Sequence, residues 1–151
     1  MQPRNELKEI DSLYKELDEL YHIMTLKVGI SDSAFQILYT IASLGDGCSQ
    51  KDIAGLYYTS RQTINSSTKK LEKEGYIQLL KVEGERDKKL FLTEAGKLLV
   101  EEKIYPIIQL ENQVYEDMEP QELRDYLRLT RKCISLFRRR VHEMTAQTDN
   151  P

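Results

Sequence analysis

Two long stretches, one near each end of the chain, repeat apolar side chains every three or four residues, and this feature constrains the fold most. Such spacing places one side chain per turn on the same face of a helix. We therefore expect a helix from about Asn5 to Lys27, which Gly29 ends, and another from near Pro120. Their apolar stripes consist of Leu7, Ile10, Tyr14, Leu17, Tyr21, Met24 and Val28 in the first helix and Leu123, Leu127, Thr130, Ile134, Phe137, Val141 and Met144 in the second.

Three shorter helices are predicted between these stripes. The first begins after Ser31 or Asp32, either of which can accept hydrogen bonds from the free amides of a first turn. The second opens with a Ser-x-x-Asp capping box, Ser49–Asp52, and the third runs over Ser60–Glu74. The inward side chains expected on the first two are Phe35, Leu38, Ile41, Ala42, Ile53, Ala54 and Leu56.

The segment that follows predicts a β-hairpin and then a long helix. Tyr76–Glu83 is rich in Ile, Leu and Val, Gly84–Asp87 is a polar turn, and Lys88–Leu92 forms the returning strand. Thr93 caps a helix that reaches about Met118.

Two further features concern the C-terminal half. Pro106 lies inside the long helix and is expected to kink it or split it in two. The small, polar tail Thr145–Pro151 is expected to be disordered. We find no internal repeat and no linker, so the 151 residues predict a single chain of ordinary domain size.

Composition excludes several classes of protein. No stretch approaches the roughly 20 apolar residues that span a bilayer, and the N-terminus lacks the apolar centre of a secretory signal. Cys48 and Cys133 are far apart and match no metal or redox spacing. We therefore expect a cytoplasmic protein with reduced thiols and without a cofactor or metal.

Charge is distributed unevenly along the chain. The net charge is -3, but residues 51–90 carry 9 basic and 6 acidic side chains, a local excess of +3. Attraction to phosphate depends on the face that is presented and not on the chain total. The alternative is that this block is a solvated surface.

The predicted helix Ser60–Glu74 has the two faces that a DNA-reading helix requires. Ile64 and Leu71 are seven residues apart and point inward, and no acidic residue occurs from Ser60 to Lys70. Arg pairs with guanine, Gln and Asn pair with adenine, and Lys and Ser suit phosphates, although Arg61 could equally clamp a phosphate. An ordinary amphipathic helix is the alternative. The candidate DNA contacts on this helix are Ser60, Arg61, Gln62, Thr63, Asn65, Ser66 and Lys69.

The segment from Ser49 to Gly96 resembles the core of the MarR family of winged helix-turn-helix regulators. The resemblance is carried by Ile53-Ala54, by Leu-Glu-Lys-Glu-Gly-Tyr-Ile at Leu71–Ile77, and by Leu-Phe-Leu-Thr-Glu-Ala-Gly at Leu90–Gly96. It implies a mainly α (α+β) fold in which residues 31–96 form the winged helix lobe, and residues 5–28 and 97–144 form dimerisation helices.

The resemblance also implies roles for the hairpin. Arg86 matches the wing arginine that enters the minor groove, and Lys88 and Lys89 would support the wing through phosphates. The family pattern has an aspartate two residues before this arginine, where the chain has Gly84. Either Glu85 or Asp87 braces Arg86 instead, or the wing is looser.

A homodimer is the expected assembly. A small winged helix cannot cover both apolar stripes, and exposed stripes of this length normally mark an interface. A two-fold dimer presents two recognition helices to successive major grooves, about 34 Å apart. The alternative is that the two terminal helices pair within one chain. The basic run Arg138–Arg140 is expected to form interface or solvent ion pairs.

The resemblance further implies an effector, a small aromatic or phenolic molecule in a cleft between the dimerisation helices and the lobe. Its binding would shift the dimer towards a spacing that mismatches DNA. Candidate pocket residues are Tyr14, Tyr21, Tyr39 and Tyr105, each of which also suits the core. His22, His142 and an inert Cys48 are expected to be structural, the alternative being a Cys48 mildly activated by the following helix.

These observations predict a DNA-binding transcriptional regulator, a repressor that binds double-stranded DNA as a homodimer. The chain offers no Ser-His-Asp or Cys-His grouping and no glycine-rich phosphate loop, so it is not expected to be an enzyme. A winged helix that binds protein without reading DNA is the competing hypothesis, which the acidic total charge favours.

Overall fold

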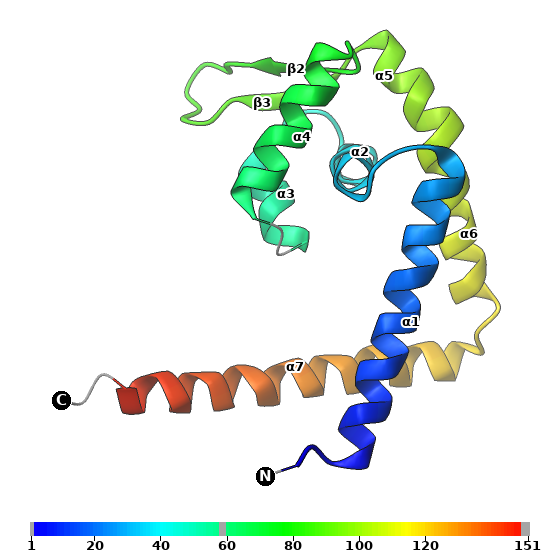
Figure 1. Ribbon diagram of the computed structural model, residues 1–151, viewed down its shortest axis with the longest axis vertical. Helices are drawn as coiled ribbons and strands as arrows, with labels where there is room; N and C mark the ends of the chain where they lie inside the picture. The colour runs from blue at the N-terminus through cyan, green and yellow to red at the C-terminus, as the bar shows by residue number, and fades with distance from the viewer. Residues whose placement is uncertain (1, 58–59, 149–151) are drawn as a thin grey trace. The chain divides into compact units, whose positions relative to one another are not determined.

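The computed structural model describes residues 2–57 and 60–148 (Figure 1). The chain divides into two compact units, Met1–Ile108 and Gln109–Pro151, and the boundary falls inside a helix and not in a linker. Within the described residues, no helix combines the length and the apolar character needed to span a membrane.

Helix α1 (Asn5–Val28) has nearly the predicted bounds. Gly29 ends it with a left-handed φ of 76°, and the Gly29 N–H donates to the carbonyl of Leu26 at 3.1 Å. The stripe is used in two ways. Its earlier apolar side chains, up to Leu20, are exposed. Its last three members pack against the core of the first unit: Tyr21, Met24 and Val28.

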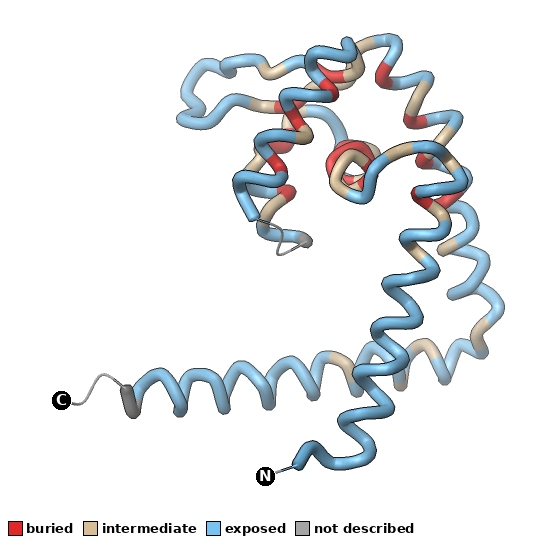
Figure 2. The backbone as a smooth tube through the Cα atoms, viewed as in Figure 1, coloured by how far each residue is buried: buried red, intermediate tan, exposed pale blue. Residues whose placement is uncertain are grey.

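Three helices, α2 (Asp32–Leu44), α3 (Gln50–Tyr57) and α4 (Arg61–Lys73), form the helical part of the lobe. Their buried side chains form one hydrophobic core. Buried residues are coloured red along the backbone in Figure 2. Most of the predicted inward side chains are buried or half-buried, but Leu56 is exposed at 55%, so its predicted inward position is wrong. The core centres on Ile37, Leu38, Ile41, Ile53, Ile64, Leu71, Ile77 and Leu90.

The starts of these helices follow the predicted capping chemistry. Ser31 and Ser60 each accept a hydrogen bond from the main-chain N–H three residues on, at 3.3 and 3.1 Å, so Ser31 and not Asp32 caps α2. At α3 the carboxylate of Asp52 accepts from the N–H and the hydroxyl of Ser49, both at 2.8 Å. The Asp52 N–H donates back to the Ser49 hydroxyl at 3.2 Å, which completes the capping box.

The sheet has three antiparallel strands in the order β1-β3-β2. β2 (Ile77–Leu80) and β3 (Lys89–Leu92) form the predicted hairpin, but pairing stops at Leu80 and Lys89, so both strands are shorter than expected. Gly84 lies in the long loop 81–88 and has a left-handed φ of 81°. The charged side chains of this loop are exposed and would gain no apolar contact if the two strands paired further. Strand β1 (Cys48–Ser49) was not predicted, because two residues form no recognisable sequence pattern.

The helix after the hairpin changes its pitch before the proline. Thr93 accepts from the Gly96 N–H at 3.0 Å, which caps α5 (Glu94–Leu99) as predicted. A π-helical segment, η1 (Val100–Ile104), then leads into α6 (Tyr105–Glu116). The wide turn lies immediately before Pro106, which has no N–H to offer, so the expected interruption takes the form of a π-helical turn.

The second unit consists of the end of α6 and α7 (Pro120–Thr148). Over residues 120–146, where burial is described, no α7 residue is buried, and the apolar stripe is largely exposed. Residues 145–148 of the expected disordered tail are helical, and the Thr145 hydroxyl donates to the Val141 carbonyl at 3.1 Å. The remaining three residues of that prediction, 149–151, lie outside the described residues.

Candidate nucleic-acid interface

Helix α4 presents one face to the core and the opposite face outward. Ile64, Thr68 and Leu71 are buried, and the Thr68 hydroxyl donates to the Ile64 carbonyl at 2.7 Å, so this face needs no other polar partner. The helical period then directs the other side chains outward. Six predicted DNA contacts on α4 are exposed: Arg61, Gln62, Thr63, Asn65, Ser66 and Lys69.

Three of the predicted hydroxyl contacts are partly occupied by local hydrogen bonds. The hydroxyls of Ser60 and Thr63 lie 2.8 Å apart, and the Ser60 oxygen also caps the helix. The hydroxyl of Ser66 donates to the Thr63 carbonyl at 2.9 Å. These groups therefore shape the start of α4, whereas Arg61, Gln62 and Asn65 extend free polar ends to solvent.

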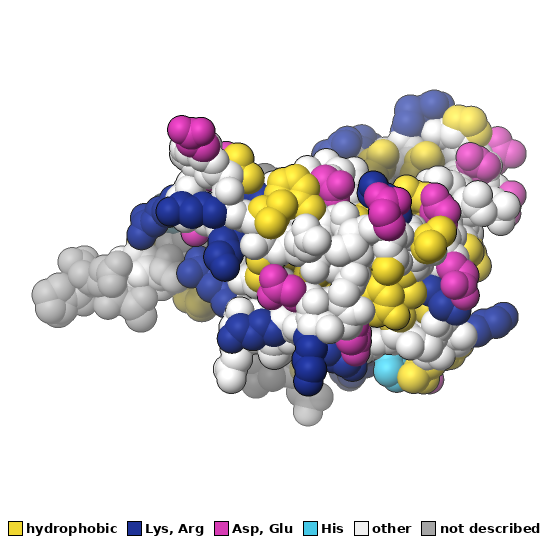
Figure 3. Space-filling model, turned by 90° about the horizontal axis from the view of Figure 1, so that it is seen from above, with side chains coloured by type: hydrophobic (Ala, Val, Ile, Leu, Met, Phe, Trp, Pro, Cys, Tyr) yellow, Lys and Arg dark blue, Asp and Glu magenta, His cyan; other side chains and the backbone are white. Residues whose placement is uncertain are grey.

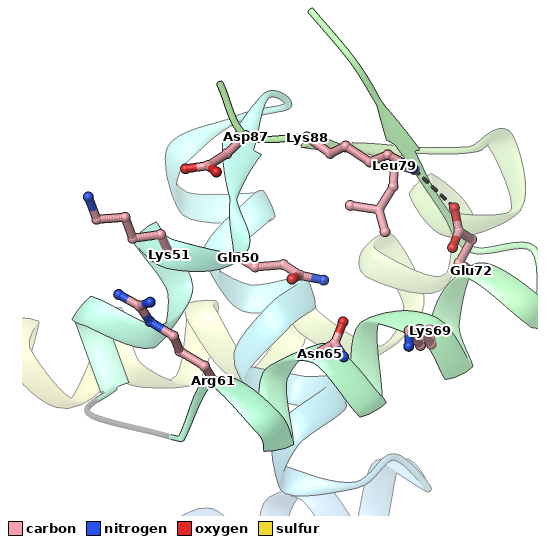
Figure 4. Close-up of a pocket in the computed structure, with 9 residues that line it drawn as sticks. All are labelled: Gln50, Lys51, Arg61, Asn65, Lys69, Glu72, Leu79, Asp87 and Lys88. Atoms are coloured by element: carbon pink, nitrogen blue, oxygen red, sulfur yellow. Dashed lines mark hydrogen bonds between the residues drawn. The ribbon is translucent and has the colours of Figure 1, made fainter. Parts of the chain in front are cut away.

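A groove of about 510 Å³ runs between α3, α4 and the hairpin (Figure 4). We call β2, β3 and loop 81–88 the wing, and this cavity the wing groove. Four cations and two carboxylates line it, a local charge of +2. Its residues are Gln50 and Lys51 from α3, Arg61, Asn65, Lys69 and Glu72 from α4, and Leu79, Asp87 and Lys88 from the wing.

Figure 4 shows how these side chains are directed. The amides of Gln50 and Asn65 point into the groove from opposite elements, while Lys51 and Arg61 extend towards the same opening. Glu72 turns to the wing, where its carboxylate accepts the Leu79 N–H at 3.3 Å. The carboxylate of Asp87 points to the opening that Lys51 and Arg61 share, so this end has two cations and one carboxylate, while Glu72 joins the other end to the wing.

The wing carries the two remaining predicted contacts, Arg86 and Lys88, and both are exposed. Lys88 lines the wing groove, whereas Arg86 does not. The carboxylate of Glu85 lies 3.5 Å from the Lys89 ammonium, so Glu85 pairs with Lys89 and not with Arg86. Within the described part of the chain, no ion pair or hydrogen bond to the Arg86 side chain occurs, which leaves its guanidinium available.

Most basic side chains of residues 51–90 lie at the surface. Seen from above, Lys and Arg are more frequent towards the left of Figure 3. Asp and Glu are more frequent over the rest of this view. Eight of the nine basic residues in 51–90 are exposed, so the local charge predicted from the sequence lies at the surface.

Five residues that line the groove were not predicted as contacts: Gln50, Lys51, Glu72, Leu79 and Asp87. The first two are the middle residues of the capping box, which must point away from the hydrogen bonds that close it. That geometry was a usable signal for the exposure of Lys51, whereas Gln50 is half-buried. Their position opposite the wing was not predictable, because it depends on the pairing of β1 with β3.

A second cavity, of about 440 Å³, lies behind α4. It is bounded by the end of α1, the start of α2, the inner side of α4, α5 and η1, and it includes Ser67, Lys70, Tyr76 and Lys103. None of the four tyrosines predicted for an effector pocket lines this cavity or the wing groove. Tyr21 and Tyr39 are half-buried against the core, whereas Tyr14 and Tyr105 are exposed at 58% and 45%.

The cysteines and His22 have ordinary structural surroundings. Burial, followed by the nearby Asp52 carboxylate, raises the pKa of the Cys48 thiol to about 11, so the alternative of a helix-activated Cys48 is wrong. Cys133 is exposed on α7. His22 Nδ1 lies 3.0 Å from the Asp32 carboxylate, and among the described residues no three His, Cys, Asp or Glu side chains cluster as metal ligands would.

The sequence of this chain is similar to those of known transcriptional regulators. The sequence profile of the MarR family matches residues 28–89. The HTH-type transcriptional regulator YybA of Bacillus subtilis strain 168 is 32% identical over 108 residues, which cover 71% of this chain and 68% of YybA.

Two solved structures share the fold. NMB1585, a MarR family regulator from Neisseria meningitidis, has a TM-score of 0.80 and 19% identity, covering 93% of this chain and 99% of that one. MepR of S. aureus, in a complex with DNA, has a TM-score of 0.72 and 20% identity, covering 89% of this chain and 99% of that one.

Proposed function

The chain belongs to the MarR family and is a DNA-binding transcriptional regulator, and from this premise we propose that it acts as a homodimeric repressor on a pseudo-palindromic operator. One observation carries the proposal. The outward face of α4 presents Arg61, Gln62, Asn65 and Lys69 without an acidic neighbour before Glu72, beside a cationic groove and an unpaired wing arginine.

In this proposal α4 enters the major groove. Arg61, in the first turn, donates two hydrogen bonds to a guanine, and Gln62 and Asn65 pair with adenine edges. Lys69, a turn or two further along, faces the phosphates. The wing lies over the adjacent minor groove, where the free guanidinium of Arg86 is attracted to the negative potential of a narrow A·T-rich segment.

The dimer is supported by the exposed apolar stripes of α1 and α7. Four apolar side chains of these stripes are each more than two-fifths exposed in the single chain: Leu13, Leu17, Ile134 and Phe137. A helix surface that faced water would carry polar side chains at such positions. Burying these stripes against a second copy removes apolar area from water at about 25 cal/mol per Å². It also gives the two-fold symmetry that a palindromic site requires.

Charge supports pairing between unlike helices of the two copies. Helix α1 carries six acidic and three basic side chains, whereas α7 carries three acidic and seven basic side chains. On α7, Glu143 pairs with Arg140 at 2.8 Å, but Arg131, Lys132 and Arg138 have no such ion pair among the described contacts. Packing α1 of one copy on α7 of the other brings opposite charges together, and packing like helices does not.

The effector is a second part of the proposal. The cavity behind α4 combines apolar walls with the Ser67 hydroxyl and with Lys70, Lys103 and Glu74, a chemistry that suits a small aromatic or phenolic molecule. Lys70 lies 4.0 Å from Glu74, and Lys103 lies 2.8 Å from Glu102. A ligand in this cavity would contact the inner side of α4. By binding better to a dimer in which the two α4 helices do not match successive major grooves, it would shift the population towards that dimer. The tyrosines predicted from the sequence, Tyr14, Tyr21, Tyr39 and Tyr105, stay predictions.

The test begins with selection of bound fragments from random duplex DNA by the full chain. We expect an inverted repeat, with half-sites about one helical turn apart. On the selected site, Arg61→Ala should weaken binding by about 1–3 kcal/mol and relax the preference at one base pair per half-site. Arg86→Ala should weaken binding to A·T-rich flanks more than to G·C-rich flanks. A reporter under the selected site should be expressed less when the protein is present.

The competing function, a winged helix that binds protein and does not read DNA, makes the opposite prediction. It requires that the selection recover no consensus and that Arg61→Ala and Arg86→Ala leave regulation of the reporter intact. If the selection recovered single sites without an inverted repeat, and the protein were a monomer, only the dimeric part of the proposal would be refuted. A panel of phenolic acids that never weakens binding would refute the effector part.

A further inference from the structure

The residues that the proposed function assigns to DNA occupy only part of the wing groove. Arg61, Asn65 and Lys69 form its α4 side, and Lys88 lies on the wing. The remaining wall is the first turn of α3, where Gln50 and Lys51 face the same cavity (Figure 4).

Two sets of contacts hold this wall in position. The capping box joins Ser49 and Asp52 by hydrogen bonds of 2.8, 2.8 and 3.2 Å, and these bonds hold the pKa of the Asp52 carboxyl below its usual value. Ser49 is also the last residue of β1, where it is the register partner of Lys89 on β3. Because the two strands are antiparallel, the residue after Ser49 is Gln50 and the residue opposite it, before Lys89, is Lys88. Gln50 and Lys88 therefore lie on opposite walls of one groove, and the pairing of β1 with β3 determines their separation.

The chemistry of the two walls fits a phosphodiester backbone. Lys51 is an exposed ammonium that extends towards the same opening as Arg61, and Gln50 supplies a side-chain amide donor beside it. The carboxylate of Glu72 lies at the other end of the groove, where it accepts the Leu79 N–H. The Asp87 carboxylate points to the Lys51 opening as well, but Lys51 and Arg61 outnumber it, so an anionic strand is favoured there.

We propose that Lys51 and Gln50 bind a phosphate of the DNA strand whose bases α4 reads, and that Lys88 faces the same backbone from the wing. This inference rests on the proposed function. It assigns the phosphate beside Arg61 to Lys51, and so leaves the Arg61 guanidinium free to reach a base edge. The two open roles of Arg61, guanine reader and phosphate clamp, are thereby separated.

The test is a salt titration of DNA binding, measured by fluorescence anisotropy on the selected site and on an unrelated duplex. Lys51→Gln should reduce the slope of log K against log salt by about 0.9 per subunit, because one phosphate contact is lost. Affinity should fall by the same factor on both duplexes, so the sequence preference is retained. Gln50→Ala should weaken binding about two- to tenfold on both duplexes, as expected for one neutral hydrogen bond.

Lys97→Gln is the matched control. Lys97 is an exposed lysine on α5 that pairs with Glu94 at 2.7 Å and does not line the groove, so its loss should leave the slope unchanged. A second experiment replaces single phosphates of the site by neutral methylphosphonates. The replacement at the Lys51 contact should weaken the wild-type protein and leave the affinity of Lys51→Gln unaltered.

Three outcomes would overturn the inference. An unchanged slope for Lys51→Gln in a wild-type protein that binds its site would remove Lys51 from the backbone and leave the proposed function standing. A changed base preference would make Lys51 a base reader. A wild-type protein without duplex binding at low salt would refute both proposals. Unchanged thermal unfolding of each variant shows that a loss of binding is not a loss of fold.

Discussion

Gly96 packs so closely on the carbonyl oxygen of Tyr76 that a Cβ at position 96 would lie 1.9 Å from that oxygen. The same carbonyl accepts the Thr93 N–H at 3.0 Å. The Thr93 hydroxyl also donates to the Gly75 carbonyl at 2.6 Å. These contacts join the beginning of β2 to the beginning of α5, and they give the Leu-Thr-x-x-Gly motif after the hairpin its physical reason.

Gly96→Ala should therefore destabilise the fold by about 3 kcal/mol, because the new methyl group meets main-chain atoms that cannot rotate away. Urea unfolding measures the change. Gly55→Ala is the matched control, since Gly55 is also helical but has no atom within 4 Å of an added Cβ. That control should stabilise the protein by about 0.5–1 kcal/mol. Equal effects of the two substitutions would contradict the close contact.

Phe137→Asp should convert the protein to a monomer. Phe137 is 63% exposed in the single chain, so the folded chain tolerates the charge, whereas a buried dimer interface does not. Light scattering measures the mass, and DNA affinity should fall by at least a hundredfold because only one half-site is held. Ser135→Asp places the same carboxylate at an exposed position on the side of α7 away from the stripe and should remain dimeric. A dimeric Phe137→Asp protein would show that the stripe is not the interface.

Thr25 and Asp32 make stability depend on acid pH. The buried Thr25 donates its hydroxyl to the Asp32 carboxylate at 2.5 Å, and this bond, with a smaller contribution from His22, lowers the pKa of Asp32. A lowered carboxyl pKa stabilises the fold above the unfolded value of 3.8 and ceases to do so as the pH falls through the folded value.

Thr25→Val should thus reduce stability at pH 7 by about 1 kcal/mol and flatten the loss of stability below pH 4. Thr25→Ser keeps the hydroxyl and should retain the acid dependence of the wild-type protein. The measurement is the free energy of unfolding between pH 3 and pH 7. If the valine variant kept the wild-type acid profile, the Asp32 carboxylate would not depend on Thr25.

Cys48 should make the fold less stable as the pH rises in the alkaline range, whereas Asp32 makes it less stable as the pH falls in the acid range. Burial raises the thiol pKa from 9.0 to about 11, so the folded state holds its proton more tightly than the unfolded state. The contribution is complete below pH 9 and is lost as the pH rises to about 11. Cys48→Ala should remove this loss, whereas Cys133→Ala, at an exposed position, should retain it. Identical alkaline profiles of the two variants would show that Cys48 is not the group responsible.

Local chemistry in the sequence determined where the helices begin and which face of α4 looks outward. Thr93 caps its helix as predicted, Ser31 is one of the two predicted caps of α2, and Ser60, predicted as the first residue of α4, is its cap, because a cap satisfies amides only three residues away. The buried Ile64 and Leu71 likewise confirm the predicted faces, because the helical period alone sets them.

Only the tertiary structure decided what lies beside these elements. The two-residue strand β1 brings Gln50 opposite Lys88, and the meeting of α1, α2, α4 and η1 forms a cavity that excludes all four predicted tyrosines. The pairing of Cys48 with Leu90 across the sheet was equally unpredictable. Each depends on residues distant in sequence, and no local pattern encodes how distant segments meet when apolar area is removed from water.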